Sequence, residues 1–168
     1  ISELYSLGIE PVMVTGDNQS AAGAVASQVG IKHFVAGVLP GGKVDEIKRL
    51  RNEYGVVAMA GDGINDAPAL TEADIGFAIG SGSDIALESG DIVLSRGGIA
   101  SIPSAVRLSR ATMRKIKQNL FWAFFYNTAG IPLAAFGLLS PVIAGACMAL
   151  SSVSVVTNSL LLKRTKLK

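Results

Sequence analysis

The sequence has no acidic residue after Asp91. All 13 aspartates and glutamates of the 168 residues lie at or before that position, whereas nine of the 15 basic residues lie beyond residue 100. A formal net charge of +2 therefore conceals an acidic first part and a basic second part. This asymmetry predicts two bodies that face different solvents.

Cysteine and histidine each occur only once. Cys147 cannot form an internal disulfide bond, and a single buried cysteine most often behaves as a small hydrophobic residue, so whether it is a metal ligand stays open. His33 lies near a predicted loop, and we expect a structural role for it. No signal peptide is visible, and residues 1–4 resemble the tail of an interrupted helix.

Two long stretches contain no charged residue. They run from 119 to 139 and from 141 to 162, and each has about the 20 residues that a helix needs to cross a bilayer. Because so little separates them, we expect a tight transmembrane helical hairpin. Basic residues cluster outside both ends of the pair, so the positive-inside rule places both ends and the acidic part in the cytoplasm. A buried hairpin in a soluble protein is the less favoured alternative.

Short apolar runs alternate with helical stretches in the first hundred residues. The runs are Pro11–Val14, Val56–Ala60, Ile75–Ile79 and Asp91–Leu94. The predicted helices are Gln19–Val29, Val44–Asn52 and Ser83–Ser89. This alternation predicts an α/β fold with a parallel sheet, in which phosphate ligands gather at the carboxyl ends of the strands.

The expected organisation has four parts. An α/β domain covers residues 1–100, an amphipathic stalk covers 101–118, the transmembrane hairpin covers 119–162 and a basic cytoplasmic tail covers 163–168. About a hundred residues can form a modest hydrophobic core. The boundaries follow the changes of charge and hydropathy along the chain.

The segment from residue 61 to residue 70 reads Gly-Asp-Gly-Ile-Asn-Asp-Ala-Pro-Ala-Leu. Two carboxylates, Asp62 and Asp66, therefore stand at the exit of a predicted buried strand, with Asn65 between them. Mg²⁺ prefers oxygen ligands and usually takes one or two carboxylates, leaving its other positions to water and phosphate oxygens. The glycines allow a sharp turn and a close approach to a ligand. Because Asp, Asn and Gly are also ordinary turn residues, the segment alone leaves both interpretations open.

Two earlier segments carry groups suited to phosphate. Thr15, Gly16 and Asp17 follow a predicted strand and precede a predicted helix, where a hydroxyl and free amides can hold a phosphate. Asp17 or Asn18 can equally be a plain helix N-cap, and the two roles can coexist. Lys43 opens the next predicted helix and can approach a phosphate as a compact positive charge, although a lysine in such a place is most often solvated.

These three segments, in this order, resemble the second half of the phosphorylation domain of P-type ATPases, the ion pumps of the haloacid dehalogenase-like superfamily. The resemblance implies a partial haloacid dehalogenase-like parallel sheet domain followed by a transmembrane α-helical hairpin. It assigns the phosphoryl group to Thr15, Gly16, Asp17 and Lys43. It assigns Mg²⁺ to Asp62 and Asp66, and cofactor binding to Asn65. The pumps' nucleophile is an aspartate in an Asp-Lys-Thr-Gly segment, which this sequence does not contain, so we expect it to come from other polypeptide.

The polar residues of the apolar stretches bear on what such a pump carries. Neither stretch contains Asp, Glu, Lys or His. Hard divalent cations normally require carboxylate oxygens, whereas a soft monovalent ion accepts sulfur, so Cu(I) or Ag(I) is favoured over Ca²⁺, Zn²⁺ or Na⁺. Tyr126, Asn127, Met148 and Ser152 also resemble the copper-transporting branch of heavy-metal P-type ATPases. The resemblance implies that these four help to bind the ion, with a cysteine pair from an earlier helix.

Each of these residues also has a structural explanation. Met is a common gap-filler, and Ser in a membrane helix often returns a hydrogen bond to its own backbone. Met148 and Ser152 share one helix face, while Cys147 points about 100° away. Pro132 cannot donate to the carbonyl of Thr128, so the first helix is predicted to loosen or kink there.

Three functional hypotheses follow. The leading one is part of a pump that couples aspartyl phosphorylation to the export of Cu(I), or of Ag(I), with Mg²⁺ and with ATP bound mainly by other domains. The resemblance implies as partners the remaining domains and membrane helices of the pump, the lipid bilayer and a copper chaperone, and no nucleic acid. The second hypothesis is a membrane-anchored haloacid dehalogenase-like phosphatase that moves no ion. The third is a segment without catalysis of its own, and the isolated chain is expected to be inactive.

Overall fold

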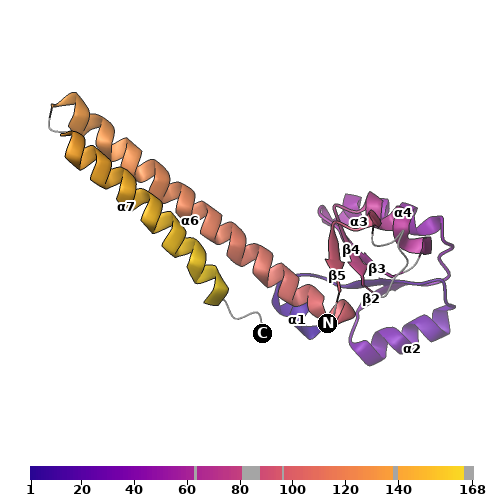
Figure 1. Cartoon of the computed structure of the whole chain (residues 1–168). Helices are drawn as coiled ribbons and strands as arrows, with labels where there is room; N and C mark the ends of the chain where they lie inside the picture. The colour runs from indigo at the N-terminus through magenta and orange to yellow at the C-terminus, as the bar shows by residue number, and fades with distance from the viewer. Residues whose placement is uncertain (63, 81–87, 96, 138–139, 165–168) are drawn as a thin grey trace. The chain divides into compact units, whose positions relative to one another are not determined.

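The computed structural model describes residues 1–62, 64–80, 88–95, 97–137 and 140–164. It divides into two compact units, Ile1–Pro103 and Ser104–Lys168 (Figure 1). The first unit opens with the short helix α1 (Ser2–Ser6), in keeping with the helix tail expected there. The helix predicted over Ser83–Ser89 lies almost entirely outside the described residues.

The described strands of the first unit form two parallel sheets. In one sheet, β1 (Val12–Val14) pairs with β2 (His33–Val35). In the other, β4 (Ile75–Ile79) lies between β3 (Ala58–Gly61) and β5 (Ile92–Leu94). Every pairing is parallel, which confirms the α/β fold class predicted from the alternation of strands and helices.

β1 and β5 each begin one residue later than predicted, and two other strands differ more from the prediction. β3 begins two residues later than expected because Val57 is engaged by Asp74. The Val57 amide donates to Oδ2 of Asp74 at 2.8 Å, and the Val57 carbonyl accepts from the Asp74 amide at 2.9 Å. β2 was not predicted, since three residues are too few to display an alternating pattern. His33 opens this strand, and its Nε2 lies 3.7 Å from Oε1 of Glu10.

Helices α2 (Gln19–Val29) and α3 (Gly42–Tyr54) follow β1 and β2 in the chain. α2 coincides with its predicted range because its ends are marked locally. Oδ1 of Asn18 accepts from the Ala21 amide at 2.9 Å, and Gly30 ends the helix with a φ of 78°. α3 begins two residues earlier than predicted, so Lys43 stands within its first turn.

Small side chains fill much of the core of the first unit. Among the residues of this unit that the structure describes, the buried hydrophobic ones are Leu4, Ala22, Ala26, Ile47, Leu50, Ala67, Ala69, Leu70, Phe77, Ala78, Leu94 and Ile102. Helix α4 (Ala67–Glu72) contacts α3, β3 and β4, and its Leu70 is 1 % exposed. Burial of such side chains is the main stabilising term of a core. The packing of α4 thereby holds Asp66, the residue before it, close to the end of β3.

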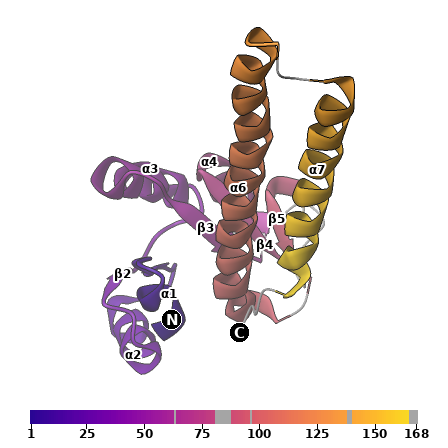
Figure 2. The ribbon, with the colours of Figure 1, turned by 90° about the vertical axis from the view of Figure 1, so that its left-hand side faces the viewer.

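The second unit is a pair of helices that lie side by side (Figures 1 and 2). α6 (Ile102–Ala135) includes nearly all of the predicted stalk and most of the first apolar stretch, and α7 (Pro141–Leu160) covers most of the second. α6 continues through Pro132 for three residues. It then ends with a hydrogen bond of 3.0 Å from the Phe136 amide to the Pro132 carbonyl, before Gly137 with a φ of 70°. The proline therefore lies in the last turn of the helix and does not interrupt it.

One helical segment among the described residues is long and apolar enough to cross a membrane. It is Ala144–Lys163, with a mean hydropathy of 1.6. It overlaps the second predicted span. The first predicted span runs on into residues 138 and 139, which are outside the described part of the chain, and it stays a prediction.

Candidate functional site

The side chains of Lys43 and Asp66 meet between α3 and the start of α4. The Nζ atom of Lys43 lies 2.5 Å from Oδ1 of Asp66, and the two side chains are only 19 % and 12 % exposed. Hydrogen bonds between charged partners are stronger than neutral ones, and reduced solvent strengthens them further. The structure thus brings together a lysine expected to meet phosphate and an aspartate expected to meet Mg²⁺.

Gly61 allows Asp66 to approach the end of β3. A Cβ atom at position 61 would lie 2.7 Å from the Cβ of Asp66 and 2.8 Å from its Oδ2. Contacts this short are excluded by van der Waals repulsion, so any other residue at 61 would displace the carboxylate. The glycine expected to bring the backbone close to a ligand here brings it close to an aspartate.

The other residues of the segment are more open to solvent. Asp62 follows β3 directly, Asn65 lies in the short helix η1 (Ile64–Asp66), and both are exposed. Asp66 precedes α4 but makes no capping hydrogen bond with its side chain. Asp66 is therefore not a plain turn residue, because its carboxylate binds a lysine from another helix. Gly63 lies outside the described residues.

A small hydrogen-bonded turn follows β1. Oγ1 of Thr15 donates to Oδ2 of Asp17 at 3.0 Å and accepts from the Asp17 amide at 3.1 Å. Of the two candidate N-caps of α2, Asn18 is the one whose side chain accepts a helix amide. Asp17 is therefore not needed to cap the helix, and its carboxylate serves to order Thr15.

Backbone hydrogen bonds connect this turn to the loop before α3. The Val38 amide donates to the Thr15 carbonyl at 3.0 Å, and the Gly37 amide donates to the Asp17 carbonyl at 2.7 Å. The loop then enters α3, where Lys43 reaches Asp66. Backbone hydrogen bonds thus join the turn after β1 to the loop before α3, and the Lys43–Asp66 contact joins α3 to the segment after β3. Within the described residues, the Thr15 and Asp17 side chains make no direct hydrogen bond to Lys43 or Asp66.

The carboxylates of Asp62 and Asp66 suit a magnesium ion that is shared with phosphate. Asp62 is exposed, and Lys43 occupies Oδ1 rather than Oδ2 of Asp66. Two carboxylates are the number that Mg²⁺ usually takes when phosphate and water supply its other ligands. In the part of the chain that the structure describes, no three His, Cys, Asp or Glu residues form a cluster that could hold a metal ion by itself. Further ligands would have to come from water, phosphate or other polypeptide.

Comparison with known proteins decides the family. The family model of haloacid dehalogenase-like hydrolases matches residues 1–74. A copper-exporting P-type ATPase of Staphylococcus saprophyticus is 57 % identical over 99 % of this chain, and one of Staphylococcus aureus is 55 % identical over 100 % of it. A zinc-transporting PIB-type ATPase, crystallised in its E2.Pi state, matches 96 % of this chain and 26 % of its own, with a TM-score of 0.88 and 40 % identity.

The chain belongs to the heavy-metal P-type ATPase family. It spans 21 % of the length of each of the two staphylococcal relatives. The relatives are named as P-type ATPases, so the match confirms the family and the integral membrane location that the sequence predicted. Ala144–Lys163 is the described helix that fits such a location.

Two of the four residues assigned to the transported ion, Asn127 and Ser152, donate hydrogen bonds to carbonyls of their own helices. Nδ2 of Asn127 donates to the Ala123 carbonyl at 2.8 Å, and Oγ of Ser152 donates to the Met148 carbonyl at 3.2 Å. Met148 is 72 % exposed. Tyr126 lines a groove of about 420 Å³ with Val153, Thr157 and other residues of α7, and the other three assigned residues do not line it. The described contacts therefore do not gather the four into one cluster.

The sequence interpretation missed a polar cluster between α6 and α7. Nζ of Lys115 donates to Oδ1 of Asn158 at 2.7 Å, and Nδ2 of Asn158 donates to Oδ1 of Asn119 at 2.7 Å. Nδ2 of Asn119 in turn donates to Oγ of Ser159 at 2.8 Å. A usable signal was present, since Asn119 and Asn158 stand at similar distances along the sequence from the hairpin turn at Ser140.

Proposed function

We propose that the chain is part of an ATP-driven pump that exports Cu(I) from the cytoplasm through an aspartyl-phosphate intermediate. The observation that carries the phosphoryl-transfer assignment is the Lys43–Asp66 pair, which is shielded from solvent at the carboxyl end of β3. Phosphoryl transfer depends mostly on positioning and on cations that neutralise the oxygens of the transferred group. A lysine held at the edge of the sheet where phosphate ligands gather meets that requirement.

Each residue of the soluble unit has a distinct proposed role. Thr15, Gly16 and Asp17 hold the phosphoryl group, and the Thr15–Asp17 hydrogen bonds keep that turn ordered in advance. Lys43 has three donors, so it can keep Asp66 as a partner and still bind a phosphoryl oxygen. The nucleophilic aspartate comes from other polypeptide of the same pump.

Magnesium belongs to the same proposal. Asp62 and Asp66 hold the ion, and Asn65 contributes to cofactor binding beside them. When it is bound, Mg²⁺ neutralises negative charge on the phosphate oxygens. The chain's own contribution is the position of Asp66, which Gly61 permits and which Lys43 maintains.

Cu(I) is the proposed transported ion, and the chemically similar Ag(I) is the alternative. The two relatives named as copper exporters are 57 % and 55 % identical to this chain, compared with 40 % for the structure named as a zinc transporter. The hydrogen bonds of Asn127 and Ser152 to their own helices use donor atoms and leave oxygen lone pairs for a cation. With the Met148 sulfur and Tyr126, these atoms supply part of a site for a soft ion, which a cysteine pair from another helix completes.

A membrane-anchored phosphatase is the second candidate. The hydrolase match over residues 1–74 agrees with it, because both classes share the soluble fold. The pump is favoured because identity to the copper exporters extends over 99 % to 100 % of the chain and so includes both long helices. The proposed partners are the rest of the pump, the lipid bilayer and a copper chaperone.

Replacement of Asp66 in the intact pump tests the phosphoryl-transfer site. Asp66→Ala should abolish Mg²⁺-dependent turnover of the phosphoenzyme, because the ion loses a ligand and Lys43 loses its partner. Asp45→Ala is a matched control, since Asp45 is an exposed carboxylate in the first turn of α3. Normal turnover in the Asp66 variant would remove the assignment.

A metal profile of ATP hydrolysis tests the cargo. Met148→Ala should lower Cu(I)-stimulated hydrolysis and Cu(I) binding, while Mg²⁺-dependent phosphate chemistry continues. Leu150→Ala provides the control, because Leu150 is also exposed and points about 200° away on the same helix. Hydrolysis without any metal stimulation would support the phosphatase instead. Unchanged Cu(I) affinity and transport in the Met148 variant would exclude that residue from the site.

A further inference from the structure

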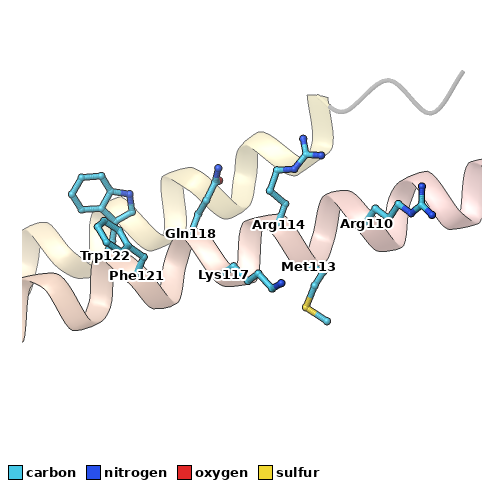
Figure 3. A pocket seen from close by; sticks show the side chains of 7 residues that line it. All are labelled: Arg110, Met113, Arg114, Lys117, Gln118, Phe121 and Trp122. Atoms are coloured by element: carbon cyan, nitrogen blue, oxygen red, sulfur yellow. The ribbon is translucent and has the colours of Figure 1, made fainter. Parts of the chain in front are cut away.

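One face of α6 forms an open groove with a positive end and an aromatic end. It measures about 510 Å³ and lies entirely within the second unit. Its lining residues are Arg110, Met113, Arg114, Lys117, Gln118, Phe121 and Trp122. Figure 3 shows these side chains in sequence along the helix, with the two aromatic rings together at one end. None of the functions proposed above uses this groove.

The spacing of the groove residues gives their relative heights. Arg114, Lys117 and Phe121 are three and four positions apart, so they share one face of the helix. At a rise of 1.5 Å per residue, Lys117 precedes Phe121 by about 6 Å along the helix axis, and Arg114 precedes it by about 10 Å. The two cations therefore lie one to two helical turns beyond the aromatic end.

The aromatic end continues as a cluster of rings. The centroid of Phe121 lies 5.5 Å from that of Trp122 and 6.0 Å from that of Phe125, and Trp122 lies 6.1 Å from Tyr126. Trp and Tyr gather where the hydrocarbon of a bilayer meets its headgroups. With this cluster at that boundary, Lys117 stands within a headgroup layer that is about 5–8 Å deep, and the longer side chain of Arg114 reaches it from outside.

The charge of this region selects an anion. No acidic residue occurs after Asp91, and both Arg114 and Lys117 have exposed side chains. Lys115, between them in sequence, is instead engaged by Asn158 of α7. A guanidinium can bind a phosphate through two parallel hydrogen bonds, and an ammonium adds a compact charge. Phe121, which is 61 % exposed, offers apolar surface beside these cations.

We propose that this groove binds an anionic phospholipid, whose headgroup phosphate meets Arg114 and Lys117 and whose acyl chain lies along Phe121. The proposal rests on the membrane location of the second unit and not on the identity of the transported ion. The ligand class is a membrane lipid rather than a soluble phosphate, because charged and apolar surfaces adjoin in the order that a lipid presents them. The site would fix the depth of α6 in the bilayer.

Lipid retention by the intact pump tests the proposal. The protein is placed in phosphatidylcholine nanodiscs with increasing phosphatidylglycerol, and bound phosphatidylglycerol is counted by native mass spectrometry without ATP or copper. Each basic residue near an anionic membrane surface strengthens attraction about fivefold, so Lys117→Gln should weaken retention about fivefold and Arg114→Gln/Lys117→Gln about 25-fold. Lys117→Arg should restore it. Lys163→Gln, which removes an exposed lysine beside the other helix, should change retention less than twofold.

Three results would overturn the proposal. Equal losses in Lys117→Gln and Lys163→Gln would indicate general attraction to the membrane rather than a site. Retention unchanged in the double variant would exclude the two cations. Displacement of phosphatidylglycerol by millimolar glycerol phosphate would identify the ligand as a soluble phosphate. Lipid retention is measured without ATP hydrolysis or copper transport. Failure of the copper-pump proposal would therefore not change how these results are interpreted.

Discussion

Lys43 and Asp66 are 23 positions apart in sequence, yet Nζ of the lysine lies 2.5 Å from Oδ1 of the aspartate. The contact joins the first turn of α3 to the residue that precedes α4. It holds one positive and one negative charge near the carboxyl end of β3, where we propose that phosphate binds. Its consequences for stability and for the site can be measured separately.

The ion pair should show strong coupling in a double-mutant cycle. Lys43→Met leaves the buried Asp66 carboxylate without its cation, so we expect a loss of about 2 kcal/mol in local stability. Asp66→Asn/Lys43→Met should lose less than the sum of the two single changes, because no charge is left unpaired. Amide hydrogen exchange of β3 and α4 in the intact pump measures the effect. Additive losses would contradict a direct interaction.

Gly61→Ala should displace Asp66. The new methyl group would lie 2.7 Å from the Asp66 Cβ, so either the strand end or η1 must move, at an expected cost of about 1–3 kcal/mol. Mg²⁺-dependent phosphoenzyme turnover should fall together with stability. Gly41→Ala is the matched control, because Gly41 has a φ of −67° and a methyl group there would have nothing within 4 Å. Full turnover in Gly61→Ala would show that the position of Asp66 is not critical.

Asp74 should give the first unit a specific dependence on pH. Its pKa lies below the usual value, first because the Val57 amide donates to it and then because Arg51 lies nearby. A lowered folded-state pKa stabilises the fold above the unfolded pKa of about 4, and that stabilisation is lost as pH falls through the folded value. Asp74→Asn should therefore be less stable than the parent at neutral pH, and the difference should shrink below about pH 4. Thermal unfolding at several pH values measures it, and a difference that stays constant in acid would exclude Asp74 as its source.

Asn158→Leu should loosen the α6–α7 pair. The change removes hydrogen bonds to Lys115 and Asn119, and such bonds between membrane helices contribute about 0.6–1.7 kcal/mol. Thermal unfolding of the purified pump in detergent should show a lower midpoint for this variant. Thr157→Val is the control, since Thr157 is one position earlier and its hydroxyl makes no hydrogen bond to a described residue. Equal shifts in the two variants would mean that general packing, not the polar cluster, holds the helices.

The sequence predicted the elements whose signals are local. β4 and α2 have their predicted bounds, because a run of apolar residues and a pair of caps act within a few positions. β2 could not be predicted, since its three residues become a strand only by pairing with β1. The start of β3 was misplaced because Asp74, 17 positions after Val57, takes the hydrogen bonds of that residue.

The candidate site shows the same division. The residue types suited to phosphate and Mg²⁺ could be recognised from Thr15, Lys43 and the segment around Asp66, because the residue type alone fixes which donor and acceptor groups a side chain carries. That Lys43 binds Asp66 was not readable, since it depends on how α3 packs against α4. The polar cluster around Asn158 was missed for the same reason.

The order of residues alone determined the alternation of strand and helix, the separation of acidic from basic chain, and two apolar stretches of membrane length, because each is a property of consecutive side chains. Tertiary structure decided that Gly61 leaves room for Asp66, that Lys43 rather than a helix end occupies its carboxylate, and that Asn158 bridges two helices. These contacts join residues far apart in the chain, and their formation depends on the packing of whole helices and strands.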